Sequence, residues 1–153
     1  MAWFSCSLSA CEKRILGIEN ATCEAQQVVE SLAVLVALRG WKARWHHERV
    51  QLRVKSDSVS ALVLAMNLKT AGRGTSIVAR EMALDIASSE YRPHIAEHIP
   101  GVDNVIADAL SRRFAPDYAF VMPACLAHVP ELKLADRDEA YFRTLRPQTS
   151  PAN

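Results

Sequence analysis

The order of helical and strand-like segments predicts an α/β fold for this 153-residue chain. The clearest strand is Val50–Ser56, where apolar and polar residues alternate with the period of two that a pleated strand requires. A long apolar stretch precedes this strand, and helical patterns lead from it to a second short strand at His94–Ile99. The resulting order of helix, strand, helix, helix, strand and helix is typical of α/β proteins.

The residues before the first clear strand contain one strong element, a helix from about Thr22 to Trp45. Asn20 or Thr22 can cap its start. Its middle, Val28–Leu38, is almost entirely apolar, so we expect burial on much of its circumference. Farther upstream, the pattern predicts a weak strand and then a connection, at Ala2–Leu8 and Ala10–Asn20 respectively.

Three further helices follow the first clear strand. Asp57 or Ser58 can cap the first of them, and Asp103 or Asn104 can cap the last. Pro93 prevents the middle helix from extending, because proline cannot continue a helix. The predicted helices are Val59–Leu68, Thr75 or Ser76 to Ser89, and Val105–Arg113.

The chain divides at about residue 114 into a domain, 1–114, and a tail, 115–153. Prolines recur through the tail and no long periodic segment appears there, so we interpret it as a linker or a loosely packed extension. Two strands do not make a stable sheet alone. The sequence therefore predicts either that its first thirty residues supply more strand or that the chain is incomplete at its amino end.

Composition excludes some classes of function but does not identify the function. The net charge of +1 gives no overall attraction to nucleic acid, so any such affinity must come from local basic patches. No apolar run is long enough to cross a bilayer, and we expect no membrane partner. The four cysteines have no metal-ligand spacing, which favours free thiols in a reducing compartment, the cytoplasm or the nucleus.

Three carboxylates are candidates for metal chemistry: Glu30, Asp57 and Asp108. Two divalent ions about 3.5–4 Å apart can activate water and neutralise a phosphodiester, and hard cations take carboxylate oxygens. Each residue also has a structural interpretation. Glu30 can lie on a solvated stripe of its helix, Asp57 can be an N-cap, and Asp108 can stabilise a helix dipole.

The residues around these carboxylates resemble one family. Val29–Leu38 resembles the catalytic-glutamate helix of ribonucleases H, and Val54–Ser58 resembles their strand-end aspartate followed by serine. The most specific match is Ile99–Arg112, which is similar to the motif that closes the ribonuclease H domain of retroelement reverse transcriptases, especially gypsy-like and DIRS-like elements. The three matches occur in the family's order over about Ala2–Phe114.

The resemblance implies a ribonuclease H-like mixed sheet flanked by helices, and hydrolysis of the RNA strand of an RNA–DNA hybrid. It implies Glu30, Asp57 and Asp108 as ligands of two Mg²⁺ ions, which Mn²⁺ can replace. His98 stands ten residues before Asp108, as the mobile histidine of many ribonucleases H does, although a plain edge-strand histidine is the more common case. A polymerase domain is expected upstream.

Two departures from the family pattern lower the expected activity. The family's first strand carries an aspartate that bridges both metals, yet no aspartate precedes Asp57 here. Ala2–Leu8 matches the third strand at best, so we expect the first strands to be lacking and activity to be weak or absent. Two alternatives stay open: a non-catalytic nucleic-acid-binding remnant or scaffold, and a decayed fragment without function.

Overall fold

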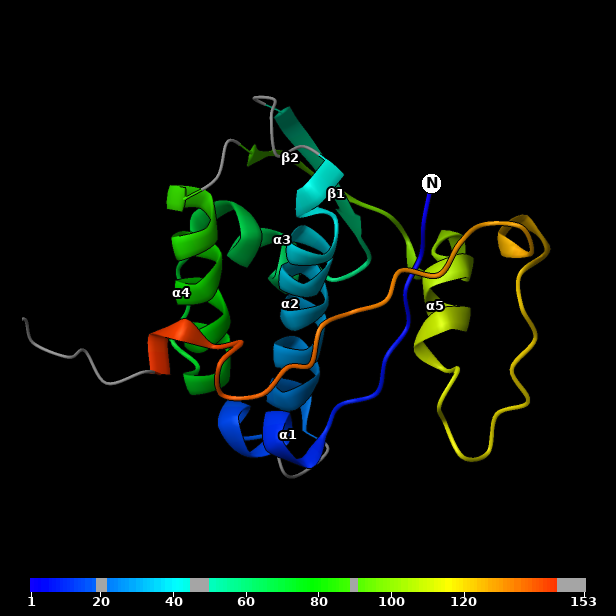
Figure 1. Cartoon of the computed structure of the whole chain (residues 1–153), viewed down its shortest axis with the longest axis horizontal. Helices are drawn as coiled ribbons and strands as arrows, with labels where there is room; N and C mark the ends of the chain where they lie inside the picture. The colour runs from blue at the N-terminus through cyan, green and yellow to red at the C-terminus, as the bar shows by residue number, and fades with distance from the viewer. Residues whose placement is uncertain (19–21, 45–49, 89–90, 146–153) are drawn as a thin grey trace, which may run out of the picture.

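The protein is described by a computed structural model that covers residues 1–18, 22–44, 50–88 and 91–145. Its elements confirm the predicted α/β class (Figure 1). The helices are α1 (Ala10–Leu16), α2 (Cys23–Gly40), α3 (Val59–Asn67), α4 (Arg73–Ser88) and α5 (Val105–Ser111), and the strands are β1 (Val50–Ser56) and β2 (Tyr91–His98). Short 3-10 turns occupy 42–44, 101–103, 124–126 and 143–145. No helix among the described residues has the length and apolarity needed to cross a bilayer.

β1 and β2 pair in parallel, and α3 and α4 form the crossover between them. The register aligns Ser56 with His98, and an irregularity falls between Leu52 and Arg53. Leu52 and Val54 pack against the core, whereas the alternate residues Arg53 and Lys55 are exposed and form ion pairs with Glu97. The period-two pattern of this segment therefore corresponds to one buried and one solvated face.

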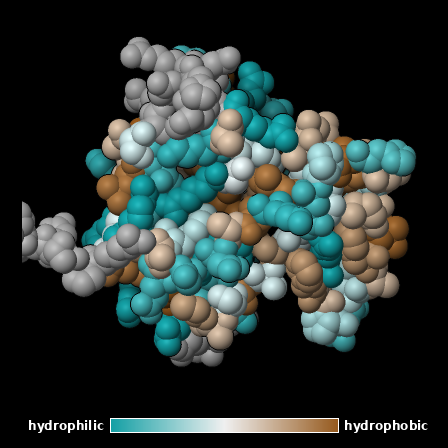
Figure 2. Space-filling view, viewed as in Figure 1, coloured by the Kyte–Doolittle hydropathy of each residue, from teal (hydrophilic) through white to brown (hydrophobic). Residues whose placement is uncertain are grey.

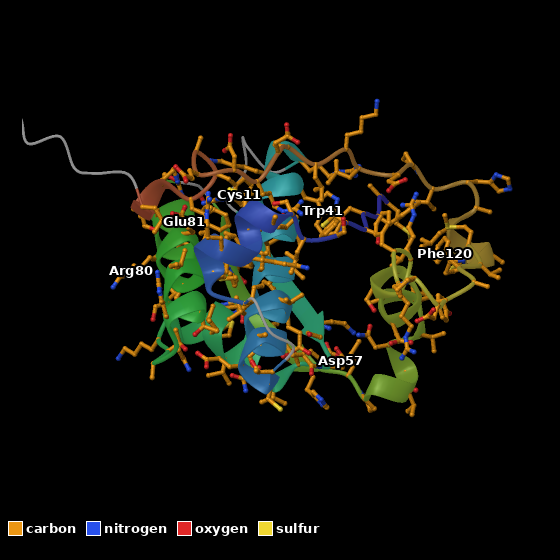
Figure 3. All side chains as sticks on the ribbon, turned by 90° about the horizontal axis from the view of Figure 1, so that it is seen from below. Cys11, Trp41, Asp57, Arg80, Glu81 and Phe120 are labelled. Atoms are coloured by element: carbon orange, nitrogen blue, oxygen red, sulfur yellow. The ribbon has the colours of Figure 1, made fainter. Side chains whose placement is uncertain are left out.

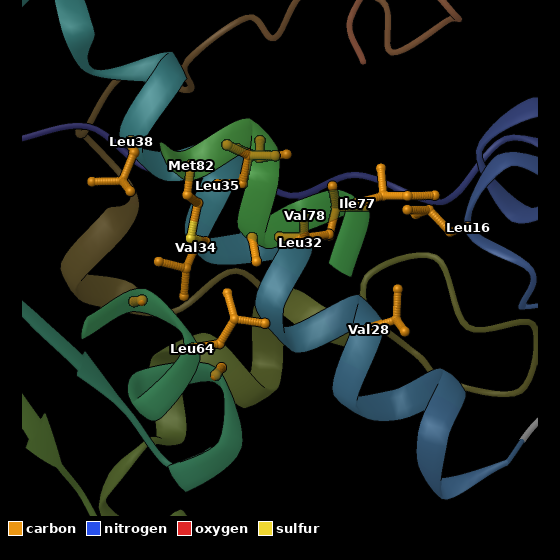
Figure 4. Packing of buried hydrophobic residues seen from close by; sticks show 14 of the residues in the cluster. Leu16, Val28, Leu32, Val34, Leu35, Leu38, Leu64, Ile77, Val78 and Met82 are labelled. Atoms are coloured by element: carbon orange, nitrogen blue, oxygen red, sulfur yellow. The ribbon is translucent and has the colours of Figure 1, made fainter. Parts of the chain in front are cut away.

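The main core lies where α2 packs against α3 and α4 (Figure 4). Leu35 and Val78 are fully buried there, as is Met82. The predicted burial of α2 on much of its circumference is confirmed between Val28 and Leu38, because most of those side chains are buried. Thr22 caps this helix by accepting a hydrogen bond from the Ala25 N–H at 3.1 Å.

The structure corrects the expected connection at Ala10–Asn20, because Ala10–Leu16 is helical. A capping box starts this helix: the Ser9 side chain accepts from the Glu12 N–H, and the Glu12 carboxylate accepts from the Ser9 N–H. Gly17 ends it with φ of +68°, a conformation that glycine adopts without strain. The Ser-x-x-Glu spacing is a sequence signal that could have revealed this helix.

The start of α4 is also earlier than predicted, at Arg73 instead of Thr75 or Ser76. Gly74 lies in its first turn, and a β-carbon there would approach the Leu16 carbonyl oxygen to 2.5 Å. This glycine therefore permits the close contact between the end of α1 and the start of α4, in addition to any role in the turn.

The N-terminal residues do not form the strand that their pattern suggested. Within Ala2–Leu8, the structure has only an isolated bridge, in which Trp3 pairs with the tail around Glu131. The Trp3 N–H donates to the Pro130 carbonyl, and the Leu132 N–H donates to the Trp3 carbonyl. Figure 1 shows this extended segment passing between α2 and α5.

The described part of the tail contacts α5, α1 and the main core. Leu126 joins Trp3 and Leu110 in a small second hydrophobic cluster. Phe142 is fully buried in the main core, and Arg137 forms a buried ion pair with Glu12 of α1. The sequence interpretation of 115–153 as a linker or loosely packed extension did not anticipate these contacts.

Candidate functional site

The described residues form a groove of about 760 Å³. One wall is the outer edge of β1 and another is α5, while α2 forms the floor and the extended segment Ala2–Cys6 crosses it. We call it the α2–α5 groove. Figure 2 shows the surface hollowed between the main helical body and the lobe that carries α5. Glu30, Asp57 and Asp108 all line this groove.

Glu30 is half-buried on α2, one helical turn after Gln26. The Gln26 side-chain amide donates a hydrogen bond to the Glu30 carboxylate at 3.0 Å. The expected solvated stripe therefore exists, but it faces the groove, because both residues line it.

Asp57 directly follows the carboxyl end of β1, and it is exposed. It is not needed as a helix cap, because the Ser58 side chain accepts from the Ala61 N–H at 3.2 Å and is the N-cap of α3. Among the described residues Asp57 has neither a hydrogen-bond nor an ion-pair partner for its side chain. Figure 3 shows it on the side of α2 that faces α5, so the carboxylate is available to a ligand in the groove.

Asp108 lies in the first turn of α5, opposite Glu30 and Asp57 across the groove. Its carboxylate pairs with Arg112, one turn farther along the same helix, at 3.0 Å. Both side chains are about half exposed, so this pair contributes only about 0.3–0.5 kcal/mol. A ligand that binds Asp108 therefore competes with a weak interaction.

His98 lies outside the α2–α5 groove. It is the last residue of β2, is exposed, and does not line the groove. The structure thus groups three of the four predicted site residues and leaves the histidine apart.

Carboxylate oxygens are suitable ligands for a hard cation, but these three carboxylates are not close enough together to share one. In the described ranges, no set of three or more His, Cys, Asp or Glu side chains is close enough to hold a metal ion. Carboxylates that line one groove without converging can bind a cation loosely, through water, more readily than they can enclose it.

Two residues in or next to the groove were not identified as site residues from the sequence. Asn104 precedes α5 and is its N-cap residue without a side-chain capping hydrogen bond, which leaves its amide toward the groove. Gly101 lies beside Asp57, since a β-carbon there would be 3.8 Å from the Asp57 carboxylate. Both belong to the Ile99–Arg112 motif, so the motif itself was the available signal.

No protein-family model, curated protein or solved structure matches the chain.

Proposed function

We propose that this chain is the ribonuclease H region of a retroelement reverse transcriptase, with a ribonuclease H-like fold and with weak or absent turnover of its own. One observation supports this most directly: Glu30 of α2, Asp57 after β1 and Asp108 of α5 line the same groove. In α/β proteins, ligands gather beyond the carboxyl ends of parallel strands, where Asp57 lies.

The reaction of this proposal is hydrolysis of RNA paired to DNA. Two magnesium ions would supply the activated water and neutralise the charge that develops on the phosphate. Glu30, Asp57 and Asp108 would hold them. Weak turnover follows from the geometry, because these carboxylates do not converge.

Cation binding tests the proposed site whether or not the protein turns over substrate. Added Mn²⁺ should broaden the NMR signals of Glu30, Asp57 and Asp108 together, and Asp57→Asn should weaken this binding at least about tenfold, since it removes the carboxylate that has no competing partner. Any cleavage of a labelled RNA–DNA hybrid in Mg²⁺ should also disappear in Asp57→Asn.

The matched control is Asp103→Asn, because Asp103 is an exposed carboxylate that precedes α5 outside the groove. It should leave both readouts unchanged. Broadening that spreads over unrelated carboxylates, or that survives Asp57→Asn, would contradict the proposed metal site.

A second function, non-catalytic binding of nucleic acid, is favoured by one observation. Arg53 and Lys55 on the solvated face of β1 are about half exposed and line the groove, where they could contact phosphates. In that case the affinity for an RNA–DNA hybrid falls steeply with salt and ignores Mg²⁺. Titrating a labelled hybrid at several salt concentrations, with and without Mg²⁺, distinguishes the two functions: an affinity that requires Mg²⁺ and is lost in Asp57→Asn excludes the second.

A further inference from the structure

The outer edge of β1 has no strand neighbour among the described residues, because β1 pairs with β2 alone. Six consecutive residues, Leu52 to Asp57, line the α2–α5 groove. Side chains of a strand alternate between its two faces, so consecutive lining means that the groove borders the strand's edge and not one face. The Ser56 carbonyl accepts from the Ile99 N–H on the β2 side, so the backbone groups of Lys55 point away from β2.

A second extended segment also borders the groove. Ala2–Cys6 is extended and also lines the groove with consecutive residues. Trp3 uses its backbone groups on the tail, whereas those of Phe4, Ser5 and Cys6 have no hydrogen-bond partner in the part of the chain that the structure describes. Two extended segments with unpaired backbone groups thus border one space, and such edges pair readily with another extended chain.

Apart from Gln26 and Glu30 at one end, the floor of the groove is apolar. Val29 and Ala33 on α2 are exposed to it, and Ala37 is half-buried, although α2 is otherwise a core helix. Alanines one turn apart allow a chain to approach the helix closely, and they offer no polar group to a ligand. An apolar helix stripe beneath an open strand edge is the surface that the next strand of a sheet would cover.

The groove has the length of a short strand. It extends along α2 from Gln26 to Trp41, which is about 22 Å at 1.5 Å per residue. About seven residues of extended chain cover that distance. Asp57, whose side chain has no partner among the described residues, lies where β1 ends, so this end of the groove favours a basic residue in the occupant.

We propose that the α2–α5 groove binds an extended segment of a separate polypeptide as an added strand beside β1. The occupant has apolar, β-branched side chains at alternate positions, which lie on Val29, Ala33 and Ala37, and a basic residue near Asp57. Main-chain hydrogen bonds to the β1 edge hold it, as in other cases of strand addition. This proposal does not rest on the proposed function, since it involves neither metal nor nucleic acid.

The probe is a fluorescently labelled eight-residue peptide of alternating threonine and valine with lysine at each end, added to the full chain in metal-free buffer. Fluorescence anisotropy should show saturable binding. A peptide with prolines at two central threonine positions should bind at least about tenfold more weakly, because proline has no N–H to donate to the strand edge. Equal binding of the two peptides, or no binding at millimolar concentration, overturns the proposal.

Two pairs of variants locate the site. Ala33→Gln fills the floor of the groove and should weaken peptide binding at least about tenfold, whereas Gln27→Ala, at an exposed position of α2 outside the groove, should change it less than about twofold. Lys55→Pro removes an outward N–H and should weaken binding, whereas Lys55→Ala keeps that N–H and should not.

Circular dichroism shows whether Lys55→Pro retains its helices, so that a loss of peptide binding is not mistaken for a folding defect. Equal affinity of Ala33→Gln and Gln27→Ala overturns the proposal. A free protein that is a dimer by sedimentation, and becomes a monomer in Ala33→Gln, would show that a second copy fills the groove, and this too overturns it.

Discussion

Phe142→Ala lowers the free energy of unfolding by about 3–5 kcal/mol, the range for removing a fully buried aromatic side chain from a core. Phe142 is 0% exposed and packs in the same cluster as α2 and α4, although it stands near the end of the described chain. The loss combines the transfer free energy of the ring with the cavity that remains. Guanidinium unfolding followed by circular dichroism measures it.

Leu145→Ala is the matched control, because Leu145 lies three residues farther along the tail and is 43% exposed. It should cost less than about 1 kcal/mol. A loss below about 1 kcal/mol for Phe142→Ala would mean that the tail contributes little to the fold, as the sequence alone suggested.

Arg39→Met lowers the free energy of unfolding by about 3 kcal/mol at neutral pH, because it removes one partner from a buried ion-pair network. Arg39 of α2 pairs with Glu81 at 2.5 Å and with Asp85 at 2.7 Å, both on α4. Arg143 of the tail pairs with the same two carboxylates. Without Arg39, two buried carboxylates share a single guanidinium.

The pH dependence of the loss identifies its cause. Burial raises the pKa of Glu81, but hydrogen bonds from the Thr144 N–H and from Arg39 outweigh burial and hold that pKa below its ordinary value of 4.5. A lowered folded-state pKa stabilises the protein above the unfolded-state pKa, and this contribution disappears as pH falls through the folded-state pKa. The deficit of Arg39→Met should therefore shrink as the pH is lowered below about 4.5.

The free energy of unfolding, measured at about five pH values between pH 3.5 and pH 7, tests this expectation. Arg14→Met is the control, because the Arg14–Glu139 pair is exposed and should contribute less than about 1 kcal/mol at any pH. A deficit that stays constant with pH would mean that Arg39 acts through its packing on the Tyr141 ring instead of its charge.

Local patterns predicted the elements whose signals lie within a few residues. The Val50–Ser56 strand was predicted with the bounds that the structure has, because its period of two reports directly which face is buried. The α1 helix was missed because its composition is mixed, although its capping box was present in the sequence. The tail contacts could not be predicted, since Phe142 reaches the core through long-range packing that leaves no periodic pattern.

Local sequence motifs also predicted part of the candidate site. The motifs around Glu30, Asp57 and Asp108 indicated the residues, and the structure lines one groove with all three. The distances among them depend on how α5 sits across from α2, and on Arg112 and Gln26 as competing partners. Sequence spacing contains no information about that arrangement.

The position of Phe142 has a consequence for synthesis of the protein. Domains generally fold from the amino end as the chain leaves the ribosome, at about 5–20 residues per second. Here the core around α2 is complete only when Phe142 has been translated, more than a hundred residues after α2 begins. Until that ring emerges, the nascent chain displays an unfinished apolar surface, which is the kind of surface that chaperones bind.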